Sequence, residues 1–306
     1  MLDGAAVAHA IRQELAPDVA AFTARAGRPP GLALVLVGDD PASHLYVNSK
    51  LKSAGESGLR ADIERLPATA SLSSLLALIE RLNASGVHDG ILVQNPLPDS
   101  MGADAEHRVF DALDPAKDVD GFHPVNVGRL VQNRAVLTPC TPSGIIELLV
   151  RSNISISGAR AVVIGRSDIV GKPVALLLLH RHATVTICHS RTADLPDVAR
   201  SADILVAALG RAAFVTADFV KPGATVIDVG TTKVEDRATV ERLFAPGSKR
   251  HQAFERRGAL VVGDVHPEVE RVAGALTPVP GGVGPLTIAL LLKNTLTAAK
   301  ERMRGR

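Results

Sequence analysis

Residues 165–173, Gly-Arg-Ser-Asp-Ile-Val-Gly-Lys-Pro, stand between two apolar runs and predict a strand, a glycine-bearing turn and a helix. Pro173 suits the first helical turn, where its missing N–H costs nothing. Such a turn directs unpaired N–H groups and the positive helix end at one point, which makes an anion site, and a nucleotide phosphate is the obvious occupant. The spacing is not the G-x-G-x-x-G dinucleotide fingerprint. From this stretch alone, a plain strand-to-helix turn and a cofactor site both stay open.

Ser190 and Arg191 bear on which nucleotide would bind. They follow the next predicted strand, over residues 184–187. In dinucleotide-binding folds the end of that second strand meets the adenosine ribose, and an acidic residue there accepts hydrogen bonds from the free ribose hydroxyls of NAD. A Ser hydroxyl and an Arg guanidinium suit a 2′-phosphate instead. The sequence therefore favours NADP over NAD.

Tyr46 and Lys50 stand four residues apart, just after a predicted strand over residues 32–37. Asp40 suits a helix N-cap and Pro41 the first helical position, so the Tyr and the Lys are expected on one face of a helix. That face begins past the carboxyl end of the strand, where open α/β sheets bind their ligands. For an isolated pair, an exposed Lys and a half-buried Tyr is the interpretation we favour.

Three further segments contain candidate site residues. Gln94 ends a strand predicted over residues 90–94. Asp118 and Asp120 alternate in an extended segment, so they point in opposite directions and only one is expected to face a given site. Three glycines within residues 277–285 would let the backbone approach a ligand closely. Taken singly, the Asp-rich segment is typical of a turn and the glycine segment of an irregular linker.

Strands and helices alternate along the chain, which implies a mostly parallel sheet covered on both faces. Predicted helices cover residues 4–26, 72–82, 195–201 and 286–299, and predicted strands cover 32–37, 90–94, 161–164, 184–187, 203–209, 225–230 and 259–265. Thr141 is expected to cap a helix that has Pro142 at its first position. The polar residues 232–258 are expected to form a surface excursion between two strands, with a partner-binding loop as the alternative.

Composition limits the classes of protein. The 306 residues suggest about two domains, and 46% hydrophobic residues with only 3% aromatic ones imply an aliphatic core. A net charge of +2 is too small to argue for nucleic acid or membrane partners. Cys140 and Cys188 are far apart and the ten histidines show no ligand spacing, so neither a disulfide framework nor a metal site is expected. Without a signal peptide or a long apolar run, a cytoplasmic protein is expected.

Together these motifs resemble one family, the bifunctional methylenetetrahydrofolate dehydrogenase/methenyltetrahydrofolate cyclohydrolases. The matching motifs occur in family order at residues 37–50, 91–98, 117–128, 138–142, 165–173 and 277–285. The resemblance implies a two-domain α/β fold. An amino-terminal α/β catalytic domain, residues 1–140, would be completed by residues 278–306. Residues 141–277 would form a carboxyl-terminal Rossmann-like NAD(P)-binding domain with a mostly parallel sheet. It also implies an active site between the domains and a homodimer.

The family's activity would be NADP-dependent oxidation of 5,10-methylenetetrahydrofolate to the methenyl cation, followed by hydrolysis to 10-formyltetrahydrofolate. Two other classes stay open. One is an NAD(P)-dependent dehydrogenase of another small substrate, which the absence of Lys50, Gln94 or Asp120 would have favoured. The other is a non-catalytic nucleotide-binding regulator, which would have the cofactor turn without a second group of polar site residues.

The resemblance also assigns roles. Lys50 corresponds to the family's catalytic lysine and Gln94 to the residue that positions it. Because a Lys at its ordinary pKa of ~10.4 is a poor base, its surroundings must lower that pKa. Tyr46 would stack on the substrate ring, and Asp120, chosen over Asp118 by motif position, would bind the pterin. The remaining predicted site residues are Pro280, Gly281 and Gly282 for the folate, and Gly165, Arg166, Ser167, Ile169, Val170, Ser190, Arg191 and Thr231 for the cofactor.

The chain departs from the family pattern at a few positions. Asn95 stands where Leu is common after the Gln, and Leu286 stands where Met is common. His266 and Pro267 replace an acidic-aromatic pair, so neither receives a role. Residues 232–258 are longer than the family leads us to expect, and no role is carried over to them.

Overall fold

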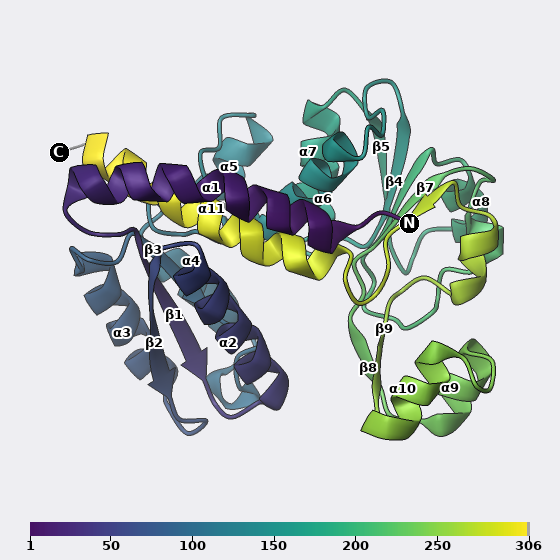
Figure 1. The fold of residues 1–306 in the computed structure, drawn as a ribbon, viewed down its shortest axis with the longest axis horizontal. Helices are drawn as coiled ribbons and strands as arrows, with labels where there is room; N and C mark the ends of the chain where they lie inside the picture. The colour runs from purple at the N-terminus through teal and green to yellow at the C-terminus, as the bar shows by residue number, and fades with distance from the viewer. Residues whose placement is uncertain (305–306) are drawn as a thin grey trace. The chain divides into compact units, whose positions relative to one another are not determined.

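The computed structural model describes residues 1–304, and the chain divides into two compact units (Figure 1). The β1 unit comprises Ala8–Cys140 and the chain from Ile288 onward, and the β4 unit comprises Met1–Val7 and Thr141–Thr287. These bounds differ from the predicted domain limits at two places, because residues 1–7 and 278–287 group with the β4 unit.

The β1 unit is built on a three-stranded parallel sheet of order β2-β1-β3. Its strands are β1 (Gly31–Val37), β2 (Arg60–Leu66) and β3 (Gly90–Val93), and its helices include α2 (Pro41–Glu56), α3 (Leu72–Ala84), α4 (Ala105–Ala112) and α5 (Pro124–Val131). Every residue of β1 is apolar and buried, as expected of a central strand covered on both faces. Side chains of β1 and β3 pack with α3 and α4 in one core, represented by Val35, Ile91, Ile79 and Val109.

The greater part of each of two long helices completes the β1 unit. Helix α1 (Gly4–Ala26) and helix α11 (Val283–Arg304) lie side by side in Figure 1. Leu15, Val19 and Phe22 of α1 share a core cluster with Leu292 and Leu296 of α11. The first and the last helix of the chain therefore close the same hydrophobic core.

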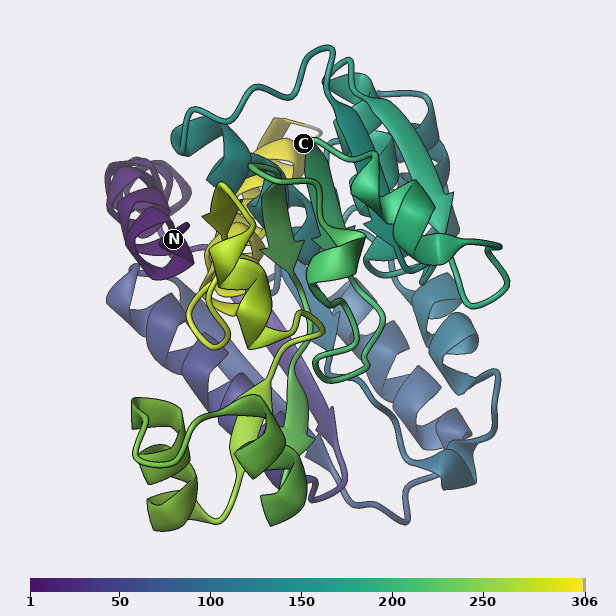
Figure 2. The ribbon, with the colours of Figure 1, turned by 90° about the vertical axis from the view of Figure 1, so that its right-hand side faces the viewer.

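The β4 unit contains a five-stranded parallel sheet of order β10-β7-β6-β4-β5, whose strands run side by side in Figure 2. Its strands are β4 (Arg160–Ile164), β5 (Thr184–Cys188), β6 (Ile204–Ala207), β7 (Thr225–Asp228) and β10 (Ala275–Leu276), and its helices include α6 (Cys140–Arg151), α7 (Gly171–His180) and α8 (Leu195–Arg200). From β4 the chain moves to one neighbour, β5, and then across to the other, β6. The strand order therefore reverses between β4 and β6.

The excursion predicted over residues 232–258 has secondary structure of its own. Strands β8 (Thr232–Val234) and β9 (Leu260–Val262) pair antiparallel, and helices α9 (Arg237–Leu243) and α10 (Lys249–Arg257) lie beyond them (Figure 2). Val240 and Phe254 belong to its small core. The strand predicted over residues 259–265 is thus shorter and pairs with β8, because Thr232–Val234 supplies a partner outside the parallel sheet.

Most predicted elements occur close to their predicted limits, and Asp40 caps α2 as expected, accepting a hydrogen bond from the Ser43 N–H at 2.8 Å. The predicted cap at Thr141 is wrong, since α6 begins one residue earlier and the Thr141 hydroxyl hydrogen-bonds the Thr287 hydroxyl at 2.8 Å. Strand β2 was not predicted from the sequence.

Candidate active site

Lys50 and Gln94 form the centre of the candidate site in the β1 unit. Lys50 lies in α2, which begins after β1, and Gln94 follows β3, the neighbour of β1 in the sheet. The Lys50 ammonium nitrogen donates to Oε1 of Gln94 at 2.9 Å, and Nε2 of Gln94 donates to the carbonyl of Asn95 at 2.6 Å. The second bond fixes the orientation of the carboxamide, so its oxygen faces the lysine.

The surroundings of Lys50 favour its neutral form. The residue is only 9% exposed, and burial lowers the pKa of its ammonium group, while the negative charge of Asp120 acts in the opposite direction. Burial also raises the pKa of Asp120, an effect that the Lys50 charge opposes. Lys50 and Asp120 are thus within electrostatic reach of each other, and burial pushes both toward neutrality.

Asp118 holds the backbone, although its charge also raises the pKa of Asp120. Its carboxylate is fully buried and accepts hydrogen bonds from the N–H groups of Gly121 at 3.1 Å and His123 at 2.8 Å, and from the Asn126 side chain at 2.9 Å. These bonds hold the segment that follows Asp118 in its turn. Of the two acids, only Asp120 interacts with Lys50.

Cys140 and Asn294 support the segment that carries Asp120, a role that sequence reasoning missed. The Cys140 thiol donates to the Val119 carbonyl at 3.2 Å, and burial together with the Asp120 charge raises the pKa of the thiol well above its ordinary value. The Asn294 side chain, from α11, donates to the carbonyls of Val119 at 2.8 Å and Thr138 at 2.9 Å. The only signal was the position of Cys140 within one of the motifs.

Tyr46 lies one helical turn before Lys50 on α2 and is 47% exposed. A large aromatic side chain left half exposed beside a buried lysine presents an apolar face that a planar ligand could cover. Leu45, its neighbour, is 73% exposed. The structure thus brings Lys50, Gln94 and Asp120 together and places Tyr46 on the same helix as the lysine.

The other predicted substrate residues, Pro280, Gly281 and Gly282, belong to the β4 unit. Gly281 has a φ of +106°, which side chains rarely adopt. A Cβ on Gly282 would lie 2.5 Å from the Pro278 carbonyl oxygen, so this position accepts only glycine without a backbone shift. The segment is therefore a tightly specified turn before α11.

The predicted cofactor residues gather at one edge of the β4-unit sheet. Ile164 pairs with Cys188 of β5 and with Ala207 of β6, and Ala207 pairs with Asp228 of β7, so these strands end at the same level. The loops after them carry the predicted residues, which are Gly165, Arg166, Ser167, Ile169 and Val170 after β4, Ser190 and Arg191 after β5, and Thr231 after β7. This edge lies at the reversal of strand order, where open α/β sheets bind ligands.

The backbone of the turn after β4 is closely packed. A Cβ on Gly165 would lie 2.1 Å from the Ala208 carbonyl oxygen, and one on Gly171 would lie 2.3 Å from the Gly165 carbonyl oxygen, so both positions require glycine. The Ser167 hydroxyl accepts hydrogen bonds from the N–H groups of Val170 and Gly171 at 3.2 Å each. Backbone packed this closely at the N-terminus of α7 fits a dinucleotide.

Ser190 and Arg191 both lie in a turn at this edge of the sheet. Hydrogen bonds involving His189 and Thr192 stabilise this turn. The Arg191 N–H donates to Nδ1 of His189 at 3.1 Å, and the His189 N–H donates to the Thr192 hydroxyl at 2.9 Å. These two bonds fix the backbone of the turn from which the Arg191 side chain extends.

Two buried carboxylates behind this edge were not predicted as site residues. Asp264 accepts from the N–H groups of Leu209 at 2.5 Å, Gly210 at 3.0 Å and Arg211 at 2.8 Å. Asp228 accepts from the N–H groups of Asp264 at 2.8 Å, Val265 at 3.0 Å and Gly230 at 2.9 Å. Burial raises the pKa of Asp228 to about 7, although its three hydrogen bonds oppose the change.

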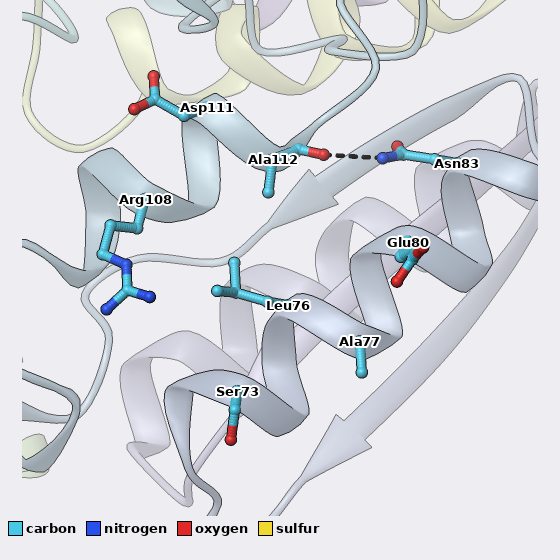
Figure 3. Close-up of a pocket in the computed structure, with 8 residues that line it drawn as sticks. All are labelled: Ser73, Leu76, Ala77, Glu80, Asn83, Arg108, Asp111 and Ala112. Carbon is cyan, nitrogen blue, oxygen red and sulfur yellow. Dashed lines mark hydrogen bonds between the residues drawn. The ribbon is translucent and has the colours of Figure 1, made fainter.

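A surface pocket lies between α3 and α4 of the β1 unit (Figure 3). Arg108 and Asp111 come from α4, and the Asn83 side chain donates to the Ala112 carbonyl at 2.7 Å across one end. None of the predicted site residues lines this pocket. It therefore gives no support to a ligand site on this face.

Within residues 1–304, no group of three His, Cys, Asp or Glu side chains lies close enough to hold a metal ion. Over the same residues, the helices are too short or too polar to cross a membrane.

Comparison with known proteins identifies both parts of the chain. The family model for the tetrahydrofolate dehydrogenase/cyclohydrolase catalytic domain matches residues 2–120, and the model for the NAD(P)-binding domain of the same family matches residues 139–303. The bifunctional protein FolD of Solibacter usitatus is 55% identical over 303 residues, which cover 99% of this chain and 98% of the relative.

Solved structures agree with this. The methylenetetrahydrofolate dehydrogenase-cyclohydrolase of Trypanosoma brucei, solved with NADP and an inhibitor, has a TM-score of 0.88 and 41% identity, covering 99% of this chain and 98% of that one. The corresponding enzyme of Campylobacter jejuni has a TM-score of 0.86 and 40% identity, covering 98% of each chain. This two-domain α/β chain belongs to the tetrahydrofolate dehydrogenase/cyclohydrolase family.

Proposed function

We propose that the protein oxidises 5,10-methylenetetrahydrofolate to 5,10-methenyltetrahydrofolate with NADP and hydrolyses this product to 10-formyltetrahydrofolate. The observation that carries the proposal is the hydrogen bond from Lys50 to Gln94, at 2.9 Å, around a lysine whose pKa burial lowers. A neutral lysine is what the hydrolysis requires as a base. The family and the full-length similarity to bifunctional relatives supply the substrate class.

In the hydrolytic step, water attacks the cationic methenyl carbon and must lose a proton as the C–O bond forms. Neutral Lys50 accepts that proton, and Gln94 holds the amine in place through its oxygen. Opening of the C–N bond then requires a proton on the departing nitrogen, which the Lys50 ammonium can return. As the formyl C=O forms, the hydroxyl group of the adduct loses its proton to the regenerated Lys50 amine, so the reaction releases one proton overall. Asp120 would accept hydrogen bonds from the pterin amino group and ring N–H, and Tyr46 would cover the ring.

The β4 unit would hold NADP at the carboxyl edge of its sheet. The glycines at 165 and 171 give the backbone room, Ser167, Ile169 and Val170 line the turn, and Arg166, Ser190 and Arg191 would bind the 2′-phosphate. Thr231 contributes from the loop after β7. The bound cofactor supplies the hydride acceptor for the oxidation. We assign Pro280, Gly281 and Gly282 to the folate side, and we assign catalysis to the β1 unit.

We further propose that two copies of the chain associate through the β4 unit. Strand β5 is an edge strand of the five-stranded sheet, and Ile187 on it is 43% exposed. Leu179, on the helix that packs beside β5, is 53% exposed. An exposed edge with apolar side chains is a natural surface for pairing. Light scattering should give a dimer, and Ile187→Glu should shift it toward monomer.

We also propose a cytoplasmic location. Cys140 and Cys188 are both free and buried, which suits a reducing compartment.

The test of the enzymatic proposal uses purified protein, NADP and 5,10-methylenetetrahydrofolate, with absorbance followed for NADPH and for the methenyl product. Hydrolysis is measured separately by adding the methenyl compound without NADP. Both reactions are expected. Well-folded protein that turns over neither substrate would overturn the proposal, and NADP binding without turnover would favour a regulator.

A further inference from the structure

The loop after β6, residues Leu209–Arg211, is held by the protein itself. Its three consecutive N–H groups all donate to one carboxylate, that of Asp264, at 2.5, 3.0 and 2.8 Å. Asp264 is fully buried, so water does not compete for these bonds. Three N–H groups converging on one point would otherwise form an anion site. Here an internal carboxylate fills that site and fixes the path of the loop.

Asp264 is in turn held by Asp228 at the end of β7. The two Asp228 oxygens accept from the N–H groups of Asp264 and Val265, and one also accepts from Gly230. The packing leaves no room for a side chain at the neighbouring glycines, Gly263 and Gly230. A Cβ on Gly263 would lie 1.8 Å from an Asp228 oxygen, and one on Gly230 would lie 2.3 Å from the Asp264 nitrogen. Two stacked carboxylates thus fasten the loops after β6 and β7 to each other.

The two loops that Asp264 and Asp228 hold lie at the edge of the sheet proposed to bind the cofactor. The loop after β6 lies at the reversal of strand order between β4 and β6, at the carboxyl edge where a dinucleotide binds. Ala208, which links β6 to this loop, packs against the turn after β4, because its carbonyl oxygen lies where a Gly165 side chain would be. The loop after β7, which includes Gly230, carries Thr231. Both fastened loops therefore border the proposed cofactor site.

We propose that Asp264 is a positioning residue for NADP, which pre-forms the Leu209–Arg211 loop as a wall of the dinucleotide site before the cofactor arrives. The inference rests on the proposed function and concerns the cofactor half of it. The loop does not need the ligand for its order, since its own N–H groups are already satisfied. Binding then avoids the entropic cost of ordering the loop.

The variant that tests this is Asp264→Asn. An Asn side chain has the size of Asp but only one acceptor oxygen, whereas both Asp264 oxygens accept from the loop. Its NH₂ group would therefore face at least one backbone N–H of the loop, and that N–H would lose its hydrogen bond. We expect the dissociation constant for NADP, measured by calorimetry, to rise tenfold or more. Hydrolysis of methenyltetrahydrofolate without NADP should stay within about twofold, because that reaction is assigned to Lys50 and Gln94 of the β1 unit and uses no NADP.

The matched control is Asp203→Asn. Asp203 also accepts a backbone N–H, that of Arg160 at 2.9 Å, but it precedes β6 and so lies at the opposite edge of the same sheet. Its NADP affinity should match the wild type. If Asp264→Asn binds NADP as tightly as wild type while folded, the inference is wrong. Wild-type protein that does not bind NADP would instead overturn the proposed function.

A measurement on the wild type covers the case in which Asp264→Asn does not fold. Hydrogen–deuterium exchange without NADP should show the amides of Leu209, Gly210 and Arg211 protected, and NADP should add little. Amides that exchange freely until NADP is added would mean that the cofactor orders the loop, which contradicts the inference.

Discussion

The ammonium nitrogen of Lys50 lies 2.9 Å from Oε1 of Gln94, although the two residues are 44 positions apart in the chain. A helix after β1 and a loop after the adjacent strand β3 bring them together. The bond uses one of the three N–H donors that a charged lysine has, or one of the two of the neutral amine. It can therefore persist through a proton transfer.

Hydrolysis of the methenyl compound should rise with pH along a limb whose pKa is below the ordinary 10.5 of lysine, because burial disfavours the charged form. Lys50→Met should abolish this activity and its pH limb. Lys52→Met is the matched control, since Lys52 lies on the same helix with a 77% exposed side chain. A Lys50→Met variant that retains hydrolysis would exclude the lysine as the base.

Gln94→Glu should move the same limb to higher pH. A carboxylate beside the Lys50 nitrogen stabilises the charged lysine, and raising a pKa by one corresponds to about 1.4 kcal/mol. Hydrolysis at pH 7 should therefore fall roughly tenfold for each pH unit by which the limb moves, while activity recovers at higher pH. Activity that falls equally at every pH would show that Gln94 acts without setting the basicity of Lys50.

Arg191→Ala should lower the preference for NADP over NAD. A charge-assisted hydrogen bond contributes about 1.5–3 kcal/mol, so KM for NADP should rise roughly 10- to 100-fold while KM for NAD stays nearly constant. Arg181→Ala serves as control, because Arg181 is exposed at the other end of α7. Equal changes for both cofactors would argue against a 2′-phosphate contact.

Asp228 should make the stability of the protein depend on pH. Its pKa is about 7 in the folded chain and 3.8 without the fold, so the native state keeps a proton that the unfolded chain loses. The contribution of this proton to the free energy of unfolding is complete below pH ~4. It is lost as the pH rises through about 7, by up to roughly 1.4 kcal/mol for each pH unit. Urea unfolding of wild type and Asp228→Asn from pH 4 to 8 should show the wild type losing stability relative to the variant. A constant difference would mean that Asp228 is ionised throughout.

Gly282→Ala should destabilise the protein by about 1–3 kcal/mol, because the new methyl group would overlap the Pro278 carbonyl. KM for the folate substrate should rise with it if the turn borders that substrate. Gly284→Ala is the control, since a Cβ there meets nothing within 4 Å. Thermal unfolding and steady-state kinetics of the two variants give the comparison.

Much of the fold was predictable because its elements are long and strongly patterned. The apolar strands β1 and β4 and the helices α1 and α3 could be recognised without knowledge of their partners. Strand β2 could not, since its sequence, Arg-Ala-Asp-Ile-Glu-Arg-Leu, is largely charged and lies at the edge of the three-stranded sheet. The ends of the strand predicted over residues 259–265 could not be predicted either, because they depend on its pairing with Thr232–Val234, which no local pattern reveals.

The candidate site also contains residues that could be predicted from the sequence and residues that could not. Lys50, Gln94 and the turn at Gly165 follow strand ends, so the rule that parallel strands end at one edge predicts where they lie. Asn294 is different, because it reaches the Val119 carbonyl from 175 positions away. Contacts at such separations depend on how a distant helix packs, and local sequence carries no signal of them.

Helix α11 has a consequence for the order in which the chain can fold. Its residues from Ile288 onward complete the core that Leu15, Val19 and Phe22 begin, so the β1 unit lacks part of its interior until the last helix has been synthesised. The main segment of the β4 unit, Thr141–Thr287, lies between these two parts of the chain. The β1 unit therefore cannot complete its core until the segment that forms most of the other unit has also been made.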